Sequence, residues 1–181
     1  MKHLPALDPD TGFLPPGRYA ASLDVLYAEF VEALDSPRRR ELWSEWEHHR
    51  AAVEAWTGEI TRLWVGGSFI SGKQEPSDVD VTYLLRSEVY DRLDQESLVS
   101  LGELTDQPWC TEHSMRIDAY VVRLPDAMPF WQMMPSLFTS ATSESFRDIG
   151  LYDEVWQRTR ASSDPAGRLG ELRRGYVEVL L

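Results

Sequence analysis

The 181 residues are enough for one well-buried core, and we expect a single domain that spans residues 1–181. An apolar content of 43% and an aromatic content of 11% are typical of a folded globular protein and exclude a disordered chain. The net charge of −12 argues against general DNA or RNA binding through a basic face, because neutralising phosphates requires clustered Lys and Arg.

Cysteine and histidine usage narrows the chemistry further. The single cysteine, Cys110, excludes an intramolecular disulfide and a zinc site built from cysteines. His48 and His49 are neighbours in a helical stretch and therefore point in different directions, so we expect structural roles for both. We find no signal-peptide pattern after Met1 and no apolar run long enough to span a bilayer, and we expect a cytoplasmic protein without membrane contact.

Prolines and helical periodicity organise the first third of the chain. Residues 1–21 predict an extended N-terminal arm, on which Phe13 and Leu14 are apolar enough to pack against the domain. Two helices are expected next, over residues 22–34 and 36–58, because Ser and Ser-Pro stand at their starts and Gly stands at the end of the second. Apolar side chains at helical spacing predict the buried face of the second helix: Leu42, Trp46, Val53 and Trp56.

The rest of the chain alternates short apolar runs with helical stretches. A helix is expected to start at Ser87 and to continue or break before Leu104, and another is expected over residues 152–160. Residues 125–150 contain an apolar patch interrupted by prolines, which predicts a short helix and a loop. Strands are predicted at residues 60–65, 78–85, 115–122 and 175–181.

Aspartates on apolar strands are the feature that requires a chemical explanation. Asp78 and Asp80 lie two residues apart on one predicted strand and therefore project from the same face, and Asp118 lies on a later strand. Like charges on a half-buried sheet are unfavourable unless a cation or a raised pKa compensates. Mg²⁺ compensates naturally, because it prefers oxygen ligands and takes a few carboxylates alongside substrate phosphates. The sequence therefore predicts a metal site formed by these three carboxylates.

A glycine-rich turn precedes the paired aspartates. The run Gly66-Gly67-Ser68 allows backbone amides to approach an anion closely, because glycine has no Cβ and tolerates unusual φ and ψ angles. An anion-binding turn that faces paired carboxylates is what a magnesium-bound triphosphate needs. We therefore predict a metal-dependent enzyme that uses a nucleotide.

These residues resemble the polymerase-beta-type nucleotidyltransferase superfamily. Its pattern is a Gly-Ser turn after a strand, here Gly67-Ser68, then Asp-x-Asp on the next strand, here Asp78 and Asp80, and a lone Asp on a later strand, here Asp118. The longer run GSFISGKQEPSDVDV, together with LPPG near the N-terminus, is similar over the full length to a small uncharacterised bacterial family within that superfamily.

The resemblance, whose motifs cover roughly residues 60–124, implies an α+β fold: a nucleotidyltransferase-like mixed β-sheet flanked by helices, with two N-terminal helices. It implies that the Gly-Ser turn holds the β- and γ-phosphates of an NTP such as ATP. Asp78 and Asp80 would bind Mg²⁺ or Mn²⁺, and Asp118 would bind metal and help to activate the acceptor hydroxyl. The reaction would move a nucleoside monophosphate to a small molecule, a protein or an RNA end such as that of a tRNA, and release pyrophosphate.

One departure from the superfamily lies between the turn and the paired acids. The segment from Gly67 to Asp78 is short and contains Pro76, which leaves little room for the helix that usually follows the turn. Phosphate contacts from a helix N-terminus are therefore not expected. Lys73 is the candidate that would contact the phosphates as a point charge instead.

Structural roles would explain the presence of these aspartates without a metal site or catalysis. Asp78 could cap a strand after Ser77, and Asp118 could pair with Arg116 or Arg123.

A regulatory protein on the same fold is the competing functional hypothesis, for example one half of a toxin–antitoxin or phage-defence pair. The acidic charge, the seven tryptophans and a Met-rich patch near Trp131 suit a protein partner. The last predicted strand, if it is exposed, would pair across a dimer. For an acidic partner the better contact is the C-terminal segment, although a solvated mixed-charge surface explains its arginines more simply: Arg158, Arg160, Arg168, Arg173 and Arg174.

Overall fold

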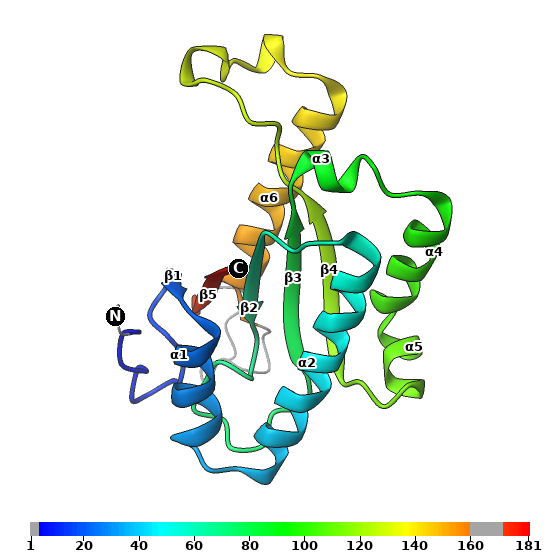
Figure 1. Cartoon of the computed structure of the whole chain (residues 1–181). Coiled ribbons are helices and arrows are strands. Elements are labelled where there is room, and N and C mark those ends of the chain that lie inside the picture. The colour runs from blue at the N-terminus through cyan, green and yellow to red at the C-terminus, as the bar shows by residue number, and fades with distance from the viewer. Residues whose placement is uncertain (1–3, 160–171) are drawn as a thin grey trace.

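The computed structural model describes residues 4–159 and 172–181, and the strands in these residues form one five-stranded sheet (Figure 1). The strand order is β1-β5-β2-β3-β4, in which β1 pairs in parallel with β5 and β3 in parallel with β4. Strand β2 is antiparallel to both of its neighbours, so the sheet is mixed, as expected. The strands are β1 (Gly17–Ala21), β2 (Arg62–Gly66), β3 (Val79–Leu85), β4 (Ile117–Arg123) and β5 (Gly175–Leu180).

Helices flank this sheet, which confirms the α+β fold class (Figure 1). Across the two described ranges, no helix has both the length and the apolar character needed to traverse a bilayer. The helices are α1 (Leu23–Tyr27), its π-helical continuation η1 (Ala28–Glu32), α2 (Pro37–Thr57), α3 (Ser87–Tyr90), α4 (Gln95–Leu104), α5 (Gln107–Glu112), the 3₁₀ helices η2 (Phe130–Gln132) and η3 (Pro135–Leu137), and α6 (Ser140–Trp156).

Adjacent residues of β3 show which helix covers which face of the sheet. Thr82 accepts a hydrogen bond from the indole N–H of Trp156 in α6 (2.9 Å), whereas the hydroxyl of Tyr83 hydrogen-bonds Nδ1 of His49 in α2 (2.8 Å). Successive side chains of a strand point to opposite faces. The two long helices therefore pack on opposite sides of the sheet, and the buried apolar residues fill the space between each helix and its face.

The N-terminal arm is only partly as predicted. It is extended, but its last five residues form β1, an edge strand that pairs with β5 near the other end of the chain. Leu14 is buried, as expected, and its carbonyl oxygen accepts a hydrogen bond from the Gly175 N–H (2.8 Å). Residues 1–3 of the predicted arm lie outside the described part of the chain.

The long helix α2 follows the sequence prediction closely. It ends at Gly58, whose left-handed backbone (φ 78°) terminates the helix. Leu42, Trp46 and Val53 are buried as predicted, but Trp56 is 38% exposed because it lies in the last turn, beside the exposed Gly58.

Three other predicted elements need correction. Helix α6 begins at Ser140 instead of residue 152, because the Thr139 hydroxyl caps it by accepting a hydrogen bond from the Thr142 N–H (3.1 Å). The helical stretch after Ser87 breaks into α3 and α4, and a further helix, α5, follows without having been predicted. Strand β5 lies between β1 and β2, so both of its edges are already paired and it cannot pair across a dimer.

Candidate functional site

A cavity of about 450 Å³ lies where β3 and β4 begin. These strands run in the same direction, so their first residues meet at one edge of the sheet. Of the predicted site residues, the cavity gathers Gly67, Ser68, Lys73, Asp78, Asp80 and Asp118. The rest of its lining comes from Ser77, Tyr120, Val155, Trp156, Arg158, Thr159 and Arg174.

Asp80 and Asp118 stand directly opposite each other on neighbouring strands. They are register partners in the parallel β3–β4 pair, both are half-buried, and both line the cavity. Register partners on adjacent strands are separated by roughly 4.8 Å and project from the same face of the sheet. Asp118 therefore faces the same cavity as Asp80 and does not point to the far face, which would have removed it from the site.

Asp78 is placed differently, because it precedes the first residue of β3. Its carboxylate lines the same cavity and accepts a hydrogen bond from the Ser77 hydroxyl (2.9 Å), which is the local role that a strand-capping residue would have. Within residues 4–159 and 172–181, no group of three or more His, Cys, Asp or Glu side chains is arranged to hold a metal ion. The joint binding of one metal by all three aspartates thus stays a prediction.

The donor chemistry of the cavity nevertheless fits a hard divalent cation. Mg²⁺ is commonly held by one or two carboxylates, with water and substrate phosphates as its remaining ligands. Asp80 and Asp118 supply two carboxylates side by side and are the residues that would hold such an ion. Asp78 lies two residues before Asp80 and adds a third oxygen donor at the same cavity.

Gly67 lies directly against the carboxylate of Asp80. Its backbone is left-handed (φ 70°), and a Cβ built on it would lie 1.5 Å from Oδ2 of Asp80. No side chain larger than hydrogen can occupy this position without displacing the carboxylate. The glycine predicted as part of an anion-binding turn is therefore also required for the placement of the acid.

Gly66 has a packing role that sequence reasoning did not anticipate. It does not line the cavity; a Cβ at this position would lie 2.6 Å from Cε3 of Trp156 in α6. The indole of Trp156 therefore packs against the Gly66 backbone and donates its N–H to Thr82. This contact makes α6 one wall of the cavity. The only sign of this role in the sequence was the second glycine before Ser68. The structure shows that a large aromatic ring approaches the strand there.

The loop after Gly67 contains no helix, as predicted, and is organised by a buried arginine instead. Arg39 of α2 is fully buried and donates to the carbonyl oxygens of Phe69 (2.6 Å), Ser71 (2.8 Å) and Lys73 (2.5 Å) in the loop. A fourth bond reaches the Phe30 carbonyl (2.8 Å) in η1. One side chain thus fixes the path of the loop relative to two helical segments.

Burial dominates the electrostatics of Arg39. It lowers the pKa of the guanidinium to about 10, and the nearby Glu75 carboxylate acts in the opposite direction. The pKa stays well above 7, so the group is charged and its partners are carbonyl dipoles. Sequence reasoning missed this residue, because Arg39 is one of three successive arginines at a helix start and these normally face solvent.

Tyr120 and Trp156 are the aromatic side chains that line the cavity, and Tyr152 packs against Tyr120. The rings of Tyr120 and Tyr152 are 4.9 Å apart, and the rings of Tyr120 and Trp156 are 5.9 Å apart. Burial raises the pKa of the Tyr120 hydroxyl, and the negative charges of Asp118 and Asp80 raise it further, with a contribution from Tyr152. Tyr120 is therefore a neutral phenol beside the two carboxylates and can act as a hydrogen-bond donor there.

Basic side chains from the loop after Gly67 and from the chain after α6 line the cavity. Lys73 and Arg158 both line it, and Arg158 also pairs with Glu154 (2.7 Å). Arg174 lines it too, and its Nε donates to the carbonyl oxygen of Trp156 (3.3 Å). Among the C-terminal arginines expected to meet an acidic partner, Arg173 binds Glu154, whereas Arg160 and Arg168 lie outside the described residues.

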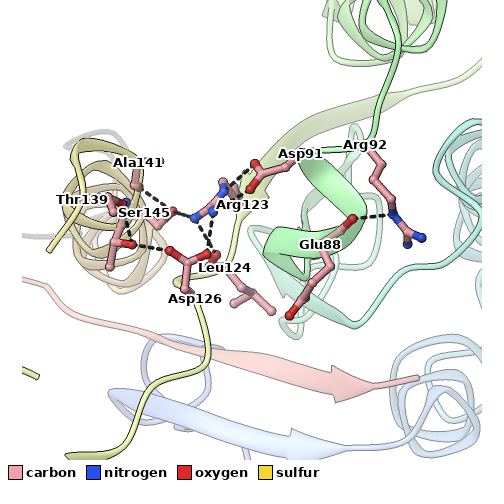
Figure 2. A network of polar contacts seen from close by, with 10 residues as sticks. Glu88, Asp91, Arg92, Arg123, Leu124, Asp126, Thr139, Ala141 and Ser145 are labelled. Carbon is pink, nitrogen blue, oxygen red and sulfur yellow. Dashed lines mark hydrogen bonds and ion pairs between the residues drawn. The ribbon is translucent and has the colours of Figure 1, made fainter. Parts of the chain in front are cut away.

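The arginines that would have neutralised Asp118 structurally bind other acids. Arg116 donates to Glu45 (2.9 Å) and Glu41 (3.2 Å) of α2. Arg123 binds Asp91 and Asp126 at the far end of β4 (Figure 2). Both arginines therefore form these ion pairs with acids other than Asp118.

The comparison with known proteins gives a family without an assigned activity. The chain matches the family described as "Family of unknown function (DUF6932)" over residues 5–180. No curated protein and no solved structure matches it.

Proposed function

The chain belongs to the Family of unknown function (DUF6932), and we propose that it is a metal-dependent nucleotidyltransferase. The observation that carries the proposal is the in-register pair of Asp80 and Asp118, which face one cavity together with the Gly67-Ser68 turn. Two adjacent carboxylates beside a glycine-containing turn and several cations are a combination suited to a metal-bound triphosphate. The substrate is an NTP, and the acceptor is a hydroxyl on a small molecule, a protein or an RNA end.

The carboxylates and the cations have separate tasks in this proposal. Asp80 and Asp118 would hold Mg²⁺ or Mn²⁺, which supplies charge neutralisation and Lewis-acid polarisation of the phosphates. Lys73 and Arg158 contact phosphate oxygens as charged donors, and Ser68 and the backbone around it bind the terminal phosphates. Tyr120, which is partly exposed and lines the cavity, offers the aromatic surface on which a base or ribose packs.

The chemical step follows from these placements. The acceptor hydroxyl attacks the α-phosphorus, an O–P bond forms, and the bond between the α-phosphorus and the bridging oxygen breaks, so that pyrophosphate leaves with its electron pair. Asp118 accepts the hydroxyl proton, which is the role that the resemblance to the nucleotidyltransferase superfamily gives to this carboxylate. Arg158 and Lys73 stabilise the charge that develops on the pyrophosphate.

A transfer assay with α-³²P-labelled NTPs tests the proposal. With Mg²⁺ or Mn²⁺ present, the wild-type protein should bind NTP and move the α-label to an acceptor, whereas a γ-label should leave as pyrophosphate. Asp118→Asn should lower transfer by about 10²-fold or more, because it removes the proton acceptor and one metal ligand. Asp24→Asn is the matched control, since Asp24 is an exposed carboxylate on α1, away from the cavity. Absence of metal-dependent NTP binding by the wild-type protein would falsify the enzyme proposal.

The second candidate is a regulatory protein on the same fold, such as a toxin–antitoxin or phage-defence component. It is favoured by the finding that the described residues contain no ready three-carboxylate metal group. In that case the protein would bind nucleotide weakly or not at all, and Asp80→Asn would leave its cellular phenotype unchanged. The enzyme proposal predicts the opposite, a phenotype that is lost with Asp80→Asn and retained with Asp24→Asn.

A further inference from the structure

An apolar loop projects from the domain between β4 and α6. We define it as residues 127–138, which contain η2 and η3 and extend beyond the ends of β3 and β4 (the upper, yellow part of Figure 1). Its large side chains face solvent: Phe130 is 86% exposed, Trp131 74% and Leu137 57%. Met133 and Met134 are also about half exposed. Exposed apolar clusters of this kind mark interaction surfaces.

Hydrogen bonds brace the base of the apolar loop (Figure 2). Arg123, the last residue of β4, donates to both carboxylate oxygens of Asp91 (2.8 Å each), to Asp126 (2.6 Å) and to the Ser145 hydroxyl of α6 (3.0 Å). The Thr142 hydroxyl donates to the second oxygen of Asp126. The residues that lead into the loop are thereby tied to Asp91 at the end of α3 and to α6, so the exposed residues are presented from a fixed base.

The charge pattern restricts what can cover these residues. The stretch 127–143 contains no Asp, Glu, Lys or Arg, although the chain carries a net charge of −12. An anionic membrane or a nucleic acid requires clustered basic residues, and this stretch has none. Two copies of this acidic chain repel each other over most of their surfaces, but not where each presents an uncharged patch. An apolar patch without charge is also complementary to itself, which a two-fold symmetric contact requires.

Packed against the same patch of a second copy, the exposed area reaches the lower limit of specific interfaces. At typical side-chain areas the five exposed residues present roughly 600 Å² of mainly apolar surface, and a standard interface buries ~800 Å² on each partner. We propose that two copies of this chain dimerise about a two-fold axis by packing their apolar loops, residues 127–138, against each other.

The proposed interface is independent of the nucleotide cavity. Asp118 lies near the start of β4, and the apolar loop follows the end of that strand, so the two are separated by the length of β4, roughly 20 Å. Dimerisation through the loop therefore leaves the cavity of each copy open. The inference stands whether or not the protein transfers nucleotides.

Sedimentation velocity over protein concentrations up to about 100 µM tests the proposal. The wild-type chain should sediment as a species of twice 20.8 kDa, and Phe130→Ser/Trp131→Ser should sediment as a monomer. Both side chains are mostly exposed and neither belongs to the buried core, so the double variant should fold normally. Val99→Ser is the matched control, because Val99 is 54% exposed on α4, and this variant should stay dimeric. A monomeric wild type, or a double variant that remains dimeric, overturns the proposal.

Thiol crosslinking gives a second measurement that does not depend on removing apolar surface. Cys110 is buried, so a cysteine introduced by Gln132→Cys is the accessible thiol on the described surface. In a two-fold contact through the apolar loop, the introduced cysteines of two copies approach each other, and mild oxidation should give a covalent dimer. Val99→Cys should not crosslink under the same conditions. Equal crosslinking of both variants would show that the contact is not specific to the loop.

Discussion

Gly67 shows how tightly a single residue constrains the cavity. We expect Gly67→Ala to lose about 1–2 kcal/mol of stability from its left-handed backbone and, in addition, most of its nucleotide transfer, because the new Cβ occupies the position of Oδ2 of Asp80. Gly58→Ala is the matched control: Gly58 also has a positive φ (78°), but no atom lies within 4 Å of its added Cβ. Denaturant unfolding should show a loss in both variants, at least as large in Gly67→Ala because its Cβ also displaces the Asp80 carboxylate, and only Gly67→Ala should lose transfer. Full activity of Gly67→Ala would contradict the placement of Asp80.

Arg39 is the residue on which the loop after Gly67 depends. We expect Arg39→Met to destabilise the protein by about 3 kcal/mol, because it leaves four carbonyl oxygens without their donor. Hydrogen exchange should accelerate for the amides of residues 68–73 more than for those of the sheet. Arg40→Met is the control, since Arg40 is exposed and its pairing with Asp35 (2.7 Å) should contribute less than about 0.5 kcal/mol. Uniform exchange throughout the chain in Arg39→Met would indicate a general stabilising role instead.

At the level of elements, local patterns predicted the strands that carry the cavity. The apolar runs around Asp80 and Asp118 fixed both the type of element and the face of each side chain, because the two-residue period of a strand leaves one choice once the apolar residues are buried. The pairing of β3 with β4 could not be predicted, since register depends on contacts between segments far apart in sequence. The structure shows that this pairing places the two acids opposite each other.

Other features escaped prediction for the same physical reason. The partner of β1 is β5, near the opposite end of the chain, and nothing in the sequence around Gly17 specifies it. Trp156 was assigned only to a helix, and its contact with Gly66 depends on how α6 crosses the sheet. Arg39 looked like a surface arginine because its four acceptors are backbone carbonyls, which have no sequence signature. Contacts between segments far apart in the sequence, and side-chain bonds to the backbone, thus cannot be predicted from local sequence patterns.

The position of α6 depends on one side chain. We expect Trp156→Leu to lose about 3 kcal/mol of stability, because it removes the indole that packs on Gly66 and the hydrogen bond to Thr82. Nucleotide affinity should fall as well, since Trp156 lines the cavity. Val155→Ala, a truncation of a 40% exposed neighbour, should change stability by less than about 1 kcal/mol. Urea unfolding measures both variants, and equal losses would mean that α6 is held elsewhere.

For the whole molecule, His49 connects the helical layer to the sheet. It is fully buried in α2, and its two ring nitrogens contact the Tyr83 hydroxyl of β3 (2.8 Å) and the Leu104 carbonyl of α4 (2.7 Å). A carbonyl oxygen only accepts, so Nε2 carries the proton and donates to Leu104, while Nδ1 accepts from Tyr83 in the neutral ring. The expected structural role of His49 is confirmed by these contacts. Protonation would put a proton on Nδ1, and the buried Tyr83 hydroxyl would then lose the acceptor for its own proton.

This arrangement predicts how global stability depends on pH. Burial lowers the pKa of His49 below its usual 6.5, so the unfolded chain binds a proton more readily than the folded one as the pH falls below that value. The stabilisation by neutral His49 is therefore complete above pH 6.5 and is lost as the pH falls towards the folded pKa, by about 1.4 kcal/mol for each unit of difference. Urea unfolding between about pH 7 and 5, above the range in which ordinary carboxylates titrate, should show this loss in the wild-type protein and in His48→Gln, whose altered side chain is exposed. His49→Gln should be less stable at pH 7 but should lose less on acidification, because the group that titrates in this window is gone. Parallel pH profiles for His49→Gln and the wild type would show that a different group controls stability below neutral pH.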